Sequence, residues 1–290
     1  VQKYSYKGLP ESQARFYALI DHTDQQLGKL LKQLDHPGLA DNTILIFMGD
    51  NGSAKGGRPD EMEYNAGLRG TKASPYQGGV RVPCFIRWPA GNLQGGRAID
   101  ALTSISDIFP TLAELAGIPL NAHTPTDGRS LVPLLTDDAK TEWPNRSIVT
   151  HVGRWPNGAA AAYKHQGSAI RNERFSLVNG QALYDLNNDP SEQHDVAKAF
   201  PEAFQSLSGQ YNRWWNTVQP HIESVPPIMV GHPAAPVSHL TCMDWNASMI
   251  EDQGDKYPPW NQGYVRTLAS GGTLEHIARL GAWKLEFARS

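Results

Sequence analysis

The sequence predicts an α/β fold in which helices flank a sheet, followed by a small antiparallel sheet with a packed helix. Two observations lead to this prediction. In the first half, segments follow one another in the order helix, strand, loop, strand, helix, which is the rhythm of an α/β sheet. From about Arg146, short alternating runs separated by turn residues replace that rhythm, which is typical of antiparallel strands.

The first element is an amphipathic helix over residues 11–33. Its apolar residues recur at helical spacing, Pro10 precedes it, and the Pro37-Gly38 pair stops it. The run TILIFM at residues 43–48 is short, continuous and rich in β-formers. It therefore predicts a strand that is buried on both faces.

A second strand and a second helix follow. Residues 80–88 (VRVPCFIRW) predict the strand, although a proline inside a strand counts against it. Residues 105–115 predict the helix, capped by Thr103 or Ser104 and closing at Gly117.

The second region contains the runs SIVTHVG, GSAIRNERFSLVNG and ALYDLN, which predict a small antiparallel sheet. Residues 196–218 then predict a helix with an aromatic stripe. We expect this stripe to be core rather than a ligand platform. It is formed by Phe204, Leu207, Tyr211, Trp214 and Trp215.

These patterns divide the chain into three predicted regions. Residues 1–145 form part of an α/β domain, and residues 146–218 form the small antiparallel-sheet subdomain. Residues 219–290 are rich in Pro, His, Gly and Trp, and their pattern predicts no particular structure.

Composition excludes several classes of partner. The formal charge is −3, which argues against nucleic-acid and anionic-membrane binding, because such proteins carry a basic patch. We find no apolar run long enough to span a bilayer. We therefore expect neither a nucleic acid nor a membrane as partner. Cys84 and Cys242 are too few for a disulfide framework and leave the redox compartment open.

The cluster Asp50-Asn51-Gly52 has two interpretations. Asn-Gly after an apolar run is a strong hairpin signal, so a simple turn is one of them. However, residues 53–63 do not look like a returning strand, and loops at the carboxyl ends of parallel strands bind ligands. A carboxylate beside an amide oxygen suits Ca²⁺ or Mg²⁺.

Lys72, in the stretch AGLRGTKAS, also has two interpretations. In isolation it is a solvated loop lysine. Alternatively, it is a fixed cation that stabilises an anionic group in a transition state. Glycines around it, at positions 67, 70, 78 and 79, would let the backbone come close to a ligand.

Taken together, these stretches resemble the sulfatase family of the alkaline-phosphatase-like superfamily. The resemblance is carried in order by NTILIFMGDNG, AGLRGTKAS and YQGGVRVPCFIRWPAG. The helical stretches before and after them fit, as does the late signature ALYDLNNDPSEQHDVA, in which Tyr184 and Leu186 are expected to pack and residues 188–190 to turn. The resemblance covers residues 4 to about 215.

The resemblance implies the chemistry of sulfate-ester hydrolysis on part of an alkaline-phosphatase-like sheet. In that family a formylglycine nucleophile and a Ca²⁺ act together. Asp50 and Asn51 would be two of the Ca²⁺ ligands, and Lys72 would bind a sulfate oxygen and assist the leaving group. Arg69 would shape its loop, and Arg81 would anchor its own. The expected partner is a sulfated small molecule or sulfated carbohydrate, and the expected location is periplasmic or extracellular.

The sequence also departs from the family pattern. Neither Cys84 nor Cys242 lies in a Cys-x-Pro-x-Arg sequence, and the early Asp-Asp metal pair and the family's histidines are absent. We therefore expect the carboxyl-terminal part of a sulfatase, inactive alone, which needs a missing N-terminal half or a complementing chain.

Alternative functions remain open at this point. A phosphodiesterase or phosphonate hydrolase of the same fold would share the metal-plus-nucleophile design. A non-catalytic module that binds sulfated glycans would retain the two metal ligands and the lysine, and one half of a split enzyme is a third alternative. His151 and His165 either reach a substrate pocket or are ordinary surface histidines.

Overall fold

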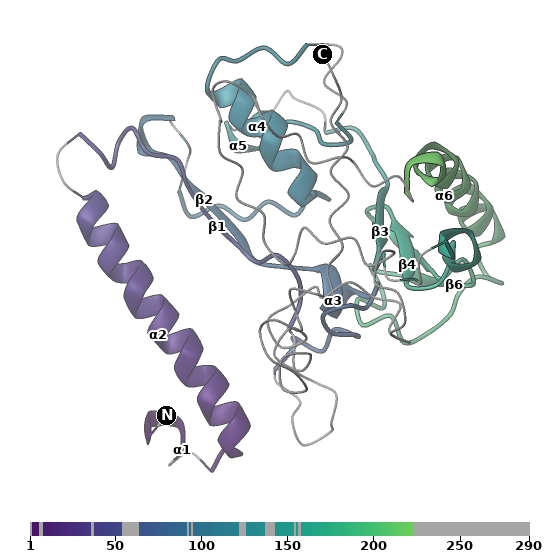
Figure 1. The fold of residues 1–290 in the computed structure, drawn as a ribbon, viewed down its shortest axis with the longest axis horizontal. Helices are drawn as coiled ribbons and strands as arrows, with labels where there is room; N and C mark the ends of the chain where they lie inside the picture. Colours follow the sequence, from purple (N-terminus) through teal and green to yellow (C-terminus); the bar gives the residue numbers. More distant parts are fainter. Residues whose placement is uncertain are drawn as a thin grey trace, which may run out of the picture. The chain divides into compact units, whose positions relative to one another are not determined.

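The structure of the chain is a computed structural model (Figure 1). Two compact units are present: residues 1–152 with 165–212, and residues 153–164 with 213–290. The predicted boundaries after residues 145 and 218 remain predictions, and Cys242 lies outside the described residues. The structure describes residues 2–5, 8–35, 38–53, 64–91, 93, 95–121, 126–136, 143–153, 155 and 158–222.

The chain begins with two helices, α1 (Gln2–Ser5) and α2 (Glu11–Leu34). Helix α2 confirms the prediction for residues 11–33. It starts directly after Pro10, and the backbone N–H of Asp35 closes its last turn on Leu31 O. Its buried side chain is that of Ala14, whereas several of its apolar side chains are exposed. Among the described residues, few apolar side chains therefore pack against the apolar face of this helix.

Strands β1 (Leu45–Met48) and β2 (Cys84–Arg87) pair antiparallel, with Phe47 opposite Phe85. The two strands confirm the predicted segments, but the prediction that the first is buried on both faces is wrong. Phe47 is 39% exposed and Phe85 is 65% exposed, because the sheet formed by the described residues has two strands. Cys84 is also exposed, and its thiol is free.

Short helical elements precede and follow β2 in the sequence: α3 (Gln77–Val80), which the sequence did not predict, and the 3₁₀ turn Pro89–Gly91. The predicted helix at 105–115 is present as a 3₁₀ turn, Ile105–Asp107, followed by α4 (Ile108–Leu115). Ser104 is its cap and forms a reciprocal capping box with Asp107. The helix α5 (Val132–Leu135) follows.

The carboxylate of Asp107, which is fully buried, holds this part of the chain together. It accepts hydrogen bonds from the backbone N–H groups of Ser104 (2.7 Å) and Arg129 (2.8 Å). Both of its oxygens lie 2.9 Å from Nη1 of Arg146. A buried carboxylate needs such partners, because burial without them is strongly unfavourable.

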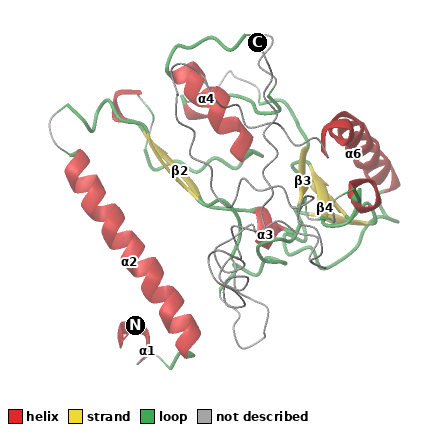
Figure 2. Ribbon diagram, in the orientation of Figure 1, coloured by secondary structure: helices red, strands yellow, loops and turns green. Residues whose placement is uncertain are grey.

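The predicted small antiparallel sheet is confirmed. It contains four strands in the order β3-β4-β5-β6, each antiparallel to its neighbour. Figure 2 labels β3 and β4 in this sheet. All residues of the central strands β4 and β5 are buried. The four strands are β3 (Ile148–His151), β4 (Ser168–Arg171), β5 (Phe175–Val178) and β6 (Ala182–Asp185). In the sequence, the 3₁₀ turn Ala160–Tyr163 comes between β3 and β4.

Helix α6 (Pro201–Ile222) follows the sheet. It begins five residues after the predicted position 196, because residues 196–200 form turns and Pro201 suits the first helical position. Leu207, Tyr211 and Trp215 are 1–3% exposed, which confirms that much of the predicted stripe is core. Among the described helices, none combines the length and the apolar character that a membrane crossing requires.

Candidate functional site

The structure brings the two polar clusters of the sequence together through backbone hydrogen bonds. The turn at Asp50–Ser53 follows β1 directly. The N–H of Gly52 donates to the carbonyl oxygen of Gly79 at 2.9 Å, and the N–H of Lys72 donates to that of Ser53 at 2.7 Å. The turn is not a two-residue hairpin loop, since the strand that pairs with β1 starts at Cys84.

Glycine is required where these segments meet. A Cβ at position 52 would lie 1.9 Å from the carbonyl oxygen of Gly78. A Cβ at position 78 would lie 2.3 Å from that of Gly70, and one at position 79 would lie 2.4 Å from that of Ser74. The glycines at 52, 78 and 79 therefore let backbone approach backbone. For positions 78 and 79, the sequence analysis predicts close approach of the backbone to a ligand instead.

Lys72 lies at an exposed turn, and Ala73 beside it has a φ of 66°. Within the described part of the chain, no hydrogen bond or ion pair holds its ammonium group. Its backbone is fixed by the hydrogen bond to Ser53, while no described side chain holds its ammonium group. This arrangement suits a cation that meets an anionic ligand.

Asp50 is exposed and Asn51 is half-buried on the same turn. A carboxylate and an amide oxygen have the donor chemistry that Ca²⁺ prefers, so these two residues fit the ion in kind. They do not fit it in number, because Ca²⁺ takes six to eight oxygen ligands. Among the described residues, no group of three or more His, Cys, Asp or Glu side chains could hold a metal.

Arg69 shapes the loop that carries Lys72, as the sequence had suggested. Its Nη1 donates to the carbonyl oxygen of Glu192 at 2.9 Å and to the hydroxyl of Tyr184 at 3.2 Å. Its guanidinium lies 4.1 Å from the centre of the Tyr76 ring. Burial raises the pKa of Tyr184, and the nearby Tyr76 adds to this effect. By contrast, the side chain of Arg81 is exposed, and its backbone N–H closes α3 on Gln77 O.

Glu192 is a residue whose role the sequence analysis missed. Its carboxylate accepts from the backbone N–H of Gln77 at 2.7 Å and from the hydroxyl of Ser176 at 2.8 Å. Its side chain is fully buried, and its φ is 52°, in the left-handed region. The available signal is the final Glu of DPSE in the late signature, from which the sequence analysis predicts only that Tyr184 and Leu186 pack and that residues 188–190 turn.

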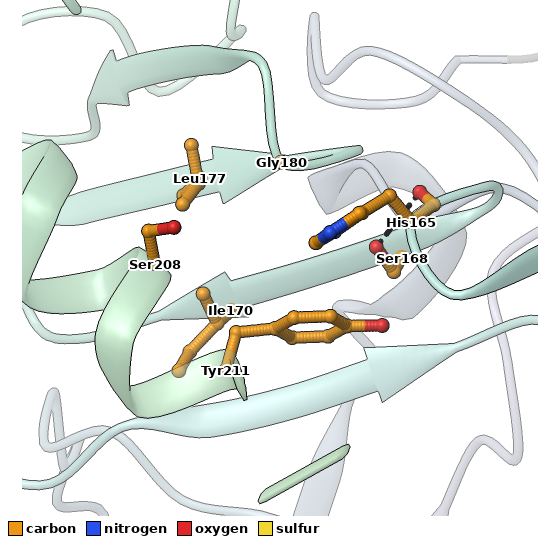
Figure 3. Close-up of a pocket in the computed structure, with 7 residues that line it drawn as sticks. All are labelled: His165, Ser168, Ile170, Leu177, Gly180, Ser208 and Tyr211. Carbon is orange, nitrogen blue, oxygen red and sulfur yellow. Dashed lines mark hydrogen bonds between the residues drawn. The ribbon is translucent and has the colours of Figure 1, made fainter. Parts of the chain in front are cut away.

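The two histidines differ in setting. His151 is half-buried at the end of β3. The ring of His165 packs 5.2 Å from that of Tyr211, in a cluster with Ile170, Leu177 and other side chains between the sheet and α6 (Figure 3). The hydroxyl of Ser168 donates to the carbonyl oxygen of His165 at 2.9 Å, and the cluster has no room for a water molecule. In the described part of the chain, His165 therefore packs against neighbours from the sheet and α6.

Comparison with known families gives two adjoining matches. The family described as Sulfatase matches residues 4–118. The family described as N-sulphoglucosamine sulphohydrolase, C-terminal, matches residues 71–213. The two matches overlap at the segment that contains Lys72, α3 and β2.

Individual relatives agree with these matches. The steryl-sulfatase of Mus musculus is 36% identical over 213 residues, which are 63% of this chain and 33% of the relative. The N-acetylgalactosamine-6-O-sulfatase of Bacteroides thetaiotaomicron is 33% identical over 209 residues, which are 66% and 40% of the two chains. This chain thus spans about a third to two-fifths of the length of these curated relatives.

Solved structures show the same likeness. The crystal structure of Ps i-CgsB in complex with k-i-k-neocarrahexaose is 27% identical to this chain, with a TM-score of 0.58. The match covers 73% of this chain and 45% of that one. A Bacteroides thetaiotaomicron protein, BT33336S-sulf, described with the metabolism of multiple glycosaminoglycans, is 28% identical with a TM-score of 0.52, over 67% and 43% of the two chains.

Proposed function

The chain belongs to the sulfatase family through residues 4–213, and on that premise we propose that it supplies part of the calcium-binding and sulfate-binding site of a sulfuric ester hydrolase. Asp50 and Asn51 provide oxygen ligands for Ca²⁺, and Lys72 contacts the sulfate group of the substrate. The observation that carries the proposal is the 2.7 Å hydrogen bond from Lys72 N–H to Ser53 O, which joins the lysine loop to the turn with the metal ligands.

The proposed chemistry needs positive charge around a reacting sulfate ester. Held by Asp50, Asn51 and ligands from outside this chain, Ca²⁺ would supply such charge. The ammonium group of Lys72 stabilises the negative charge that develops as the bond to the leaving oxygen breaks. The backbone hydrogen bond to Ser53 places the base of the lysine side chain beside the Asp50-Asn51 turn.

The nucleophile is proposed to lie outside these 290 residues, since the printed sequence contains no Cys-x-Pro-x-Arg. By resemblance to the family it is a formylglycine in a preceding part of the same protein or in a complementing chain. The proposed substrate is a sulfated carbohydrate or a sulfated small molecule, in keeping with the names of the relatives. The expected periplasmic or extracellular location stays a prediction.

The test compares two proteins on 4-nitrophenyl sulfate in the presence of CaCl₂. One is the purified 290-residue chain, and the other is the full-length product of its gene. We expect hydrolysis by the full-length product and none by the chain alone. Turnover by the chain alone contradicts the proposed half-site. A full-length product that cleaves bis-4-nitrophenyl phosphate but no sulfate ester favours the phosphodiesterase alternative.

A further inference from the structure

Glu192 lies at the centre of a set of contacts that reach the proposed site. Its fully buried carboxylate binds the first residue of α3, through Gln77 N–H at 2.7 Å, and strand β5, through the Ser176 hydroxyl at 2.8 Å. Its backbone carbonyl oxygen accepts from Arg69, in the lysine loop, at 2.9 Å. One residue therefore joins α3, the small sheet and the lysine loop.

A buried arginine holds the same segment from the small sheet. Arg171, on β4, is 6% exposed, and its Nη2 donates to the carbonyl oxygen of Pro75 at 2.6 Å. Burial lowers the pKa of its guanidinium, whereas the negative charge of Glu192 opposes that effect. Arg171 and Glu192 thus hold the same short segment, at residues 75 and 77 respectively.

Backbone hydrogen bonds lead from this segment to the proposed ligands. The N–H of Gly78, next to Gln77, donates to Arg69 O at 2.7 Å. Gly79 O accepts from Gly52 N–H at 2.9 Å, and Gly52 follows Asn51 directly. No space for a Cβ exists at Gly52 or Gly78, so a shift of α3 displaces the turn as well.

We propose that Glu192 is a positioning residue for the sulfate-ester site: through Gln77 and Arg69 it sets the position of the Lys72 loop relative to the Asp50–Ser53 turn. This inference rests on the proposed function for its catalytic consequence. Its structural part does not depend on the proposed function: a change at residue 192 should loosen the backbone at residues 52, 72 and 77, which can be measured without an activity assay.

The control is a second buried carboxylate, that of Asp107. It is as fully buried as Glu192 and binds Arg146 and two backbone N–H groups. Its hydrogen-bond partners are Ser104, Arg129 and Arg146, none of which is in the lysine loop or α3. Glu192→Gln and Asp107→Asn each remove one buried negative charge at nearly constant shape, so a general loss of stability affects both variants.

The first measurement is amide hydrogen exchange by NMR in the ¹⁵N-labelled full-length gene product. In Glu192→Gln, we expect exchange at Gln77, Lys72 and Gly52 to accelerate about tenfold or more relative to amides inside α6, because hydrogen bonds at the segment are lost. In Asp107→Asn, the faster amides should instead be those of Ser104 and Arg129. Ser176→Ala, which removes one hydroxyl contact to Glu192, should give a smaller acceleration at the same three amides and serves if Glu192→Gln does not fold.

Unchanged exchange at residues 52, 72 and 77 in Glu192→Gln, or equal changes in both carboxylate variants, overturns the proposal. The second measurement is steady-state hydrolysis of 4-nitrophenyl sulfate by the full-length gene product. We expect Glu192→Gln to lower kcat about tenfold or more with little change in KM, since a displaced Lys72 loses a contact made in the transition state. Asp107→Asn should keep kcat near that of the wild type, and an equal fall in both variants contradicts the positioning role.

The two measurements separate the failure of this inference from that of the proposed function. A wild-type full-length product that cleaves no sulfate ester contradicts the proposed function, while the exchange data still decide the coupling. A fully active product whose Glu192→Gln variant shows normal exchange and normal kcat contradicts the positioning role alone.

Discussion

The backbone N–H of Lys72 donates a 2.7 Å hydrogen bond to the carbonyl oxygen of Ser53. This contact joins the loop that follows Arg69 to the turn that contains Asp50 and Asn51. A lysine and the Asp50-Asn51 pair, separated in sequence, therefore lie on two segments that a backbone hydrogen bond joins. The proposed sulfatase chemistry depends on that arrangement.

The first prediction concerns Lys72. In the full-length protein, Lys72→Ala should lower kcat for 4-nitrophenyl sulfate by about 10²–10³, as does removal of a single stabilising group from other charged transition states. Its melting temperature should stay near that of the wild type, because the side chain is exposed. Lys198→Ala, which removes another exposed lysine, is the control and should leave kcat unchanged. A Lys72→Ala variant with near wild-type kcat would show that Lys72 is an ordinary loop lysine.

The second prediction concerns the metal. Asp50→Ala should weaken Ca²⁺ binding by the full-length protein at least about tenfold, since the charge of the ligand set controls affinity for this ion. Isothermal titration with CaCl₂ measures the effect, and chelation with EDTA should abolish hydrolysis in the wild type. Asp24→Ala removes an exposed carboxylate of α2 and should not change Ca²⁺ affinity. Equal affinities for the Asp50 variant and the wild type would exclude Asp50 as a ligand.

The third prediction compares two glycines. Gly52→Ala places a Cβ against the carbonyl oxygen of Gly78 and should destabilise the chain by about 1–3 kcal/mol or more. Gly28→Ala adds a methyl group in open space within α2 and should stabilise the helix by about 0.5–1 kcal/mol. Urea denaturation of the 290-residue chain measures both changes. Two changes of the same sign would contradict the close backbone contact at Gly52.

Much of the local structure could be predicted from the sequence, because its signals are local. Pro10 and the helical spacing of apolar residues predicted α2, and Ser104 with Asp107 forms the expected helix cap. Alternating runs predicted the four-stranded sheet. The turn at Asp50 and the lysine at position 72 were found by motif, and the structure joins them through their backbones.

The missed features depend on partners that are distant in sequence. Glu192 binds Gln77 across 115 positions, so no local pattern revealed its role. The run at β1 is apolar enough for burial on both faces, yet burial requires neighbouring elements that the described residues do not provide. The apolar character of a strand shows that it can be buried, whereas only the structure shows whether another element covers it.

The fourth prediction is a pH dependence of stability. The guanidinium of Arg174, hydrogen-bonded at 2.9 Å to Asp185, lowers the pKa of that carboxyl below its ordinary value. A carboxyl with a lowered folded-state pKa contributes stability above its unfolded pKa of about 3.9 and loses it as the pH falls through the folded value. Arg174→Met should therefore lower the melting temperature at pH 7, and the difference from the wild type should shrink progressively below about pH 4.

Thermal denaturation of the chain at several pH values checks this prediction. The control is Arg15→Met, which removes the partner of Glu11 in a pair whose two side chains are both exposed. This variant should change the melting temperature little at any pH, because exposed ion pairs contribute little to stability. A constant difference between Arg174→Met and the wild type from pH 7 to pH 2.5 would show that packing, and not the ion pair, is responsible.

Sequencing the coding DNA on the 5′ side of the Val1 codon decides whether the rest of the proposed site precedes this chain. We expect an in-frame extension that encodes an Asp-Asp pair and a Cys-x-Pro-x-Arg sequence, which complete the site begun by Asp50, Asn51 and Lys72. An extension with Thr at the nucleophile position would contradict it and indicate phosphoryl transfer. A start codon at Val1, with no complementing reading frame nearby, would also contradict it and leave a binding module without catalysis.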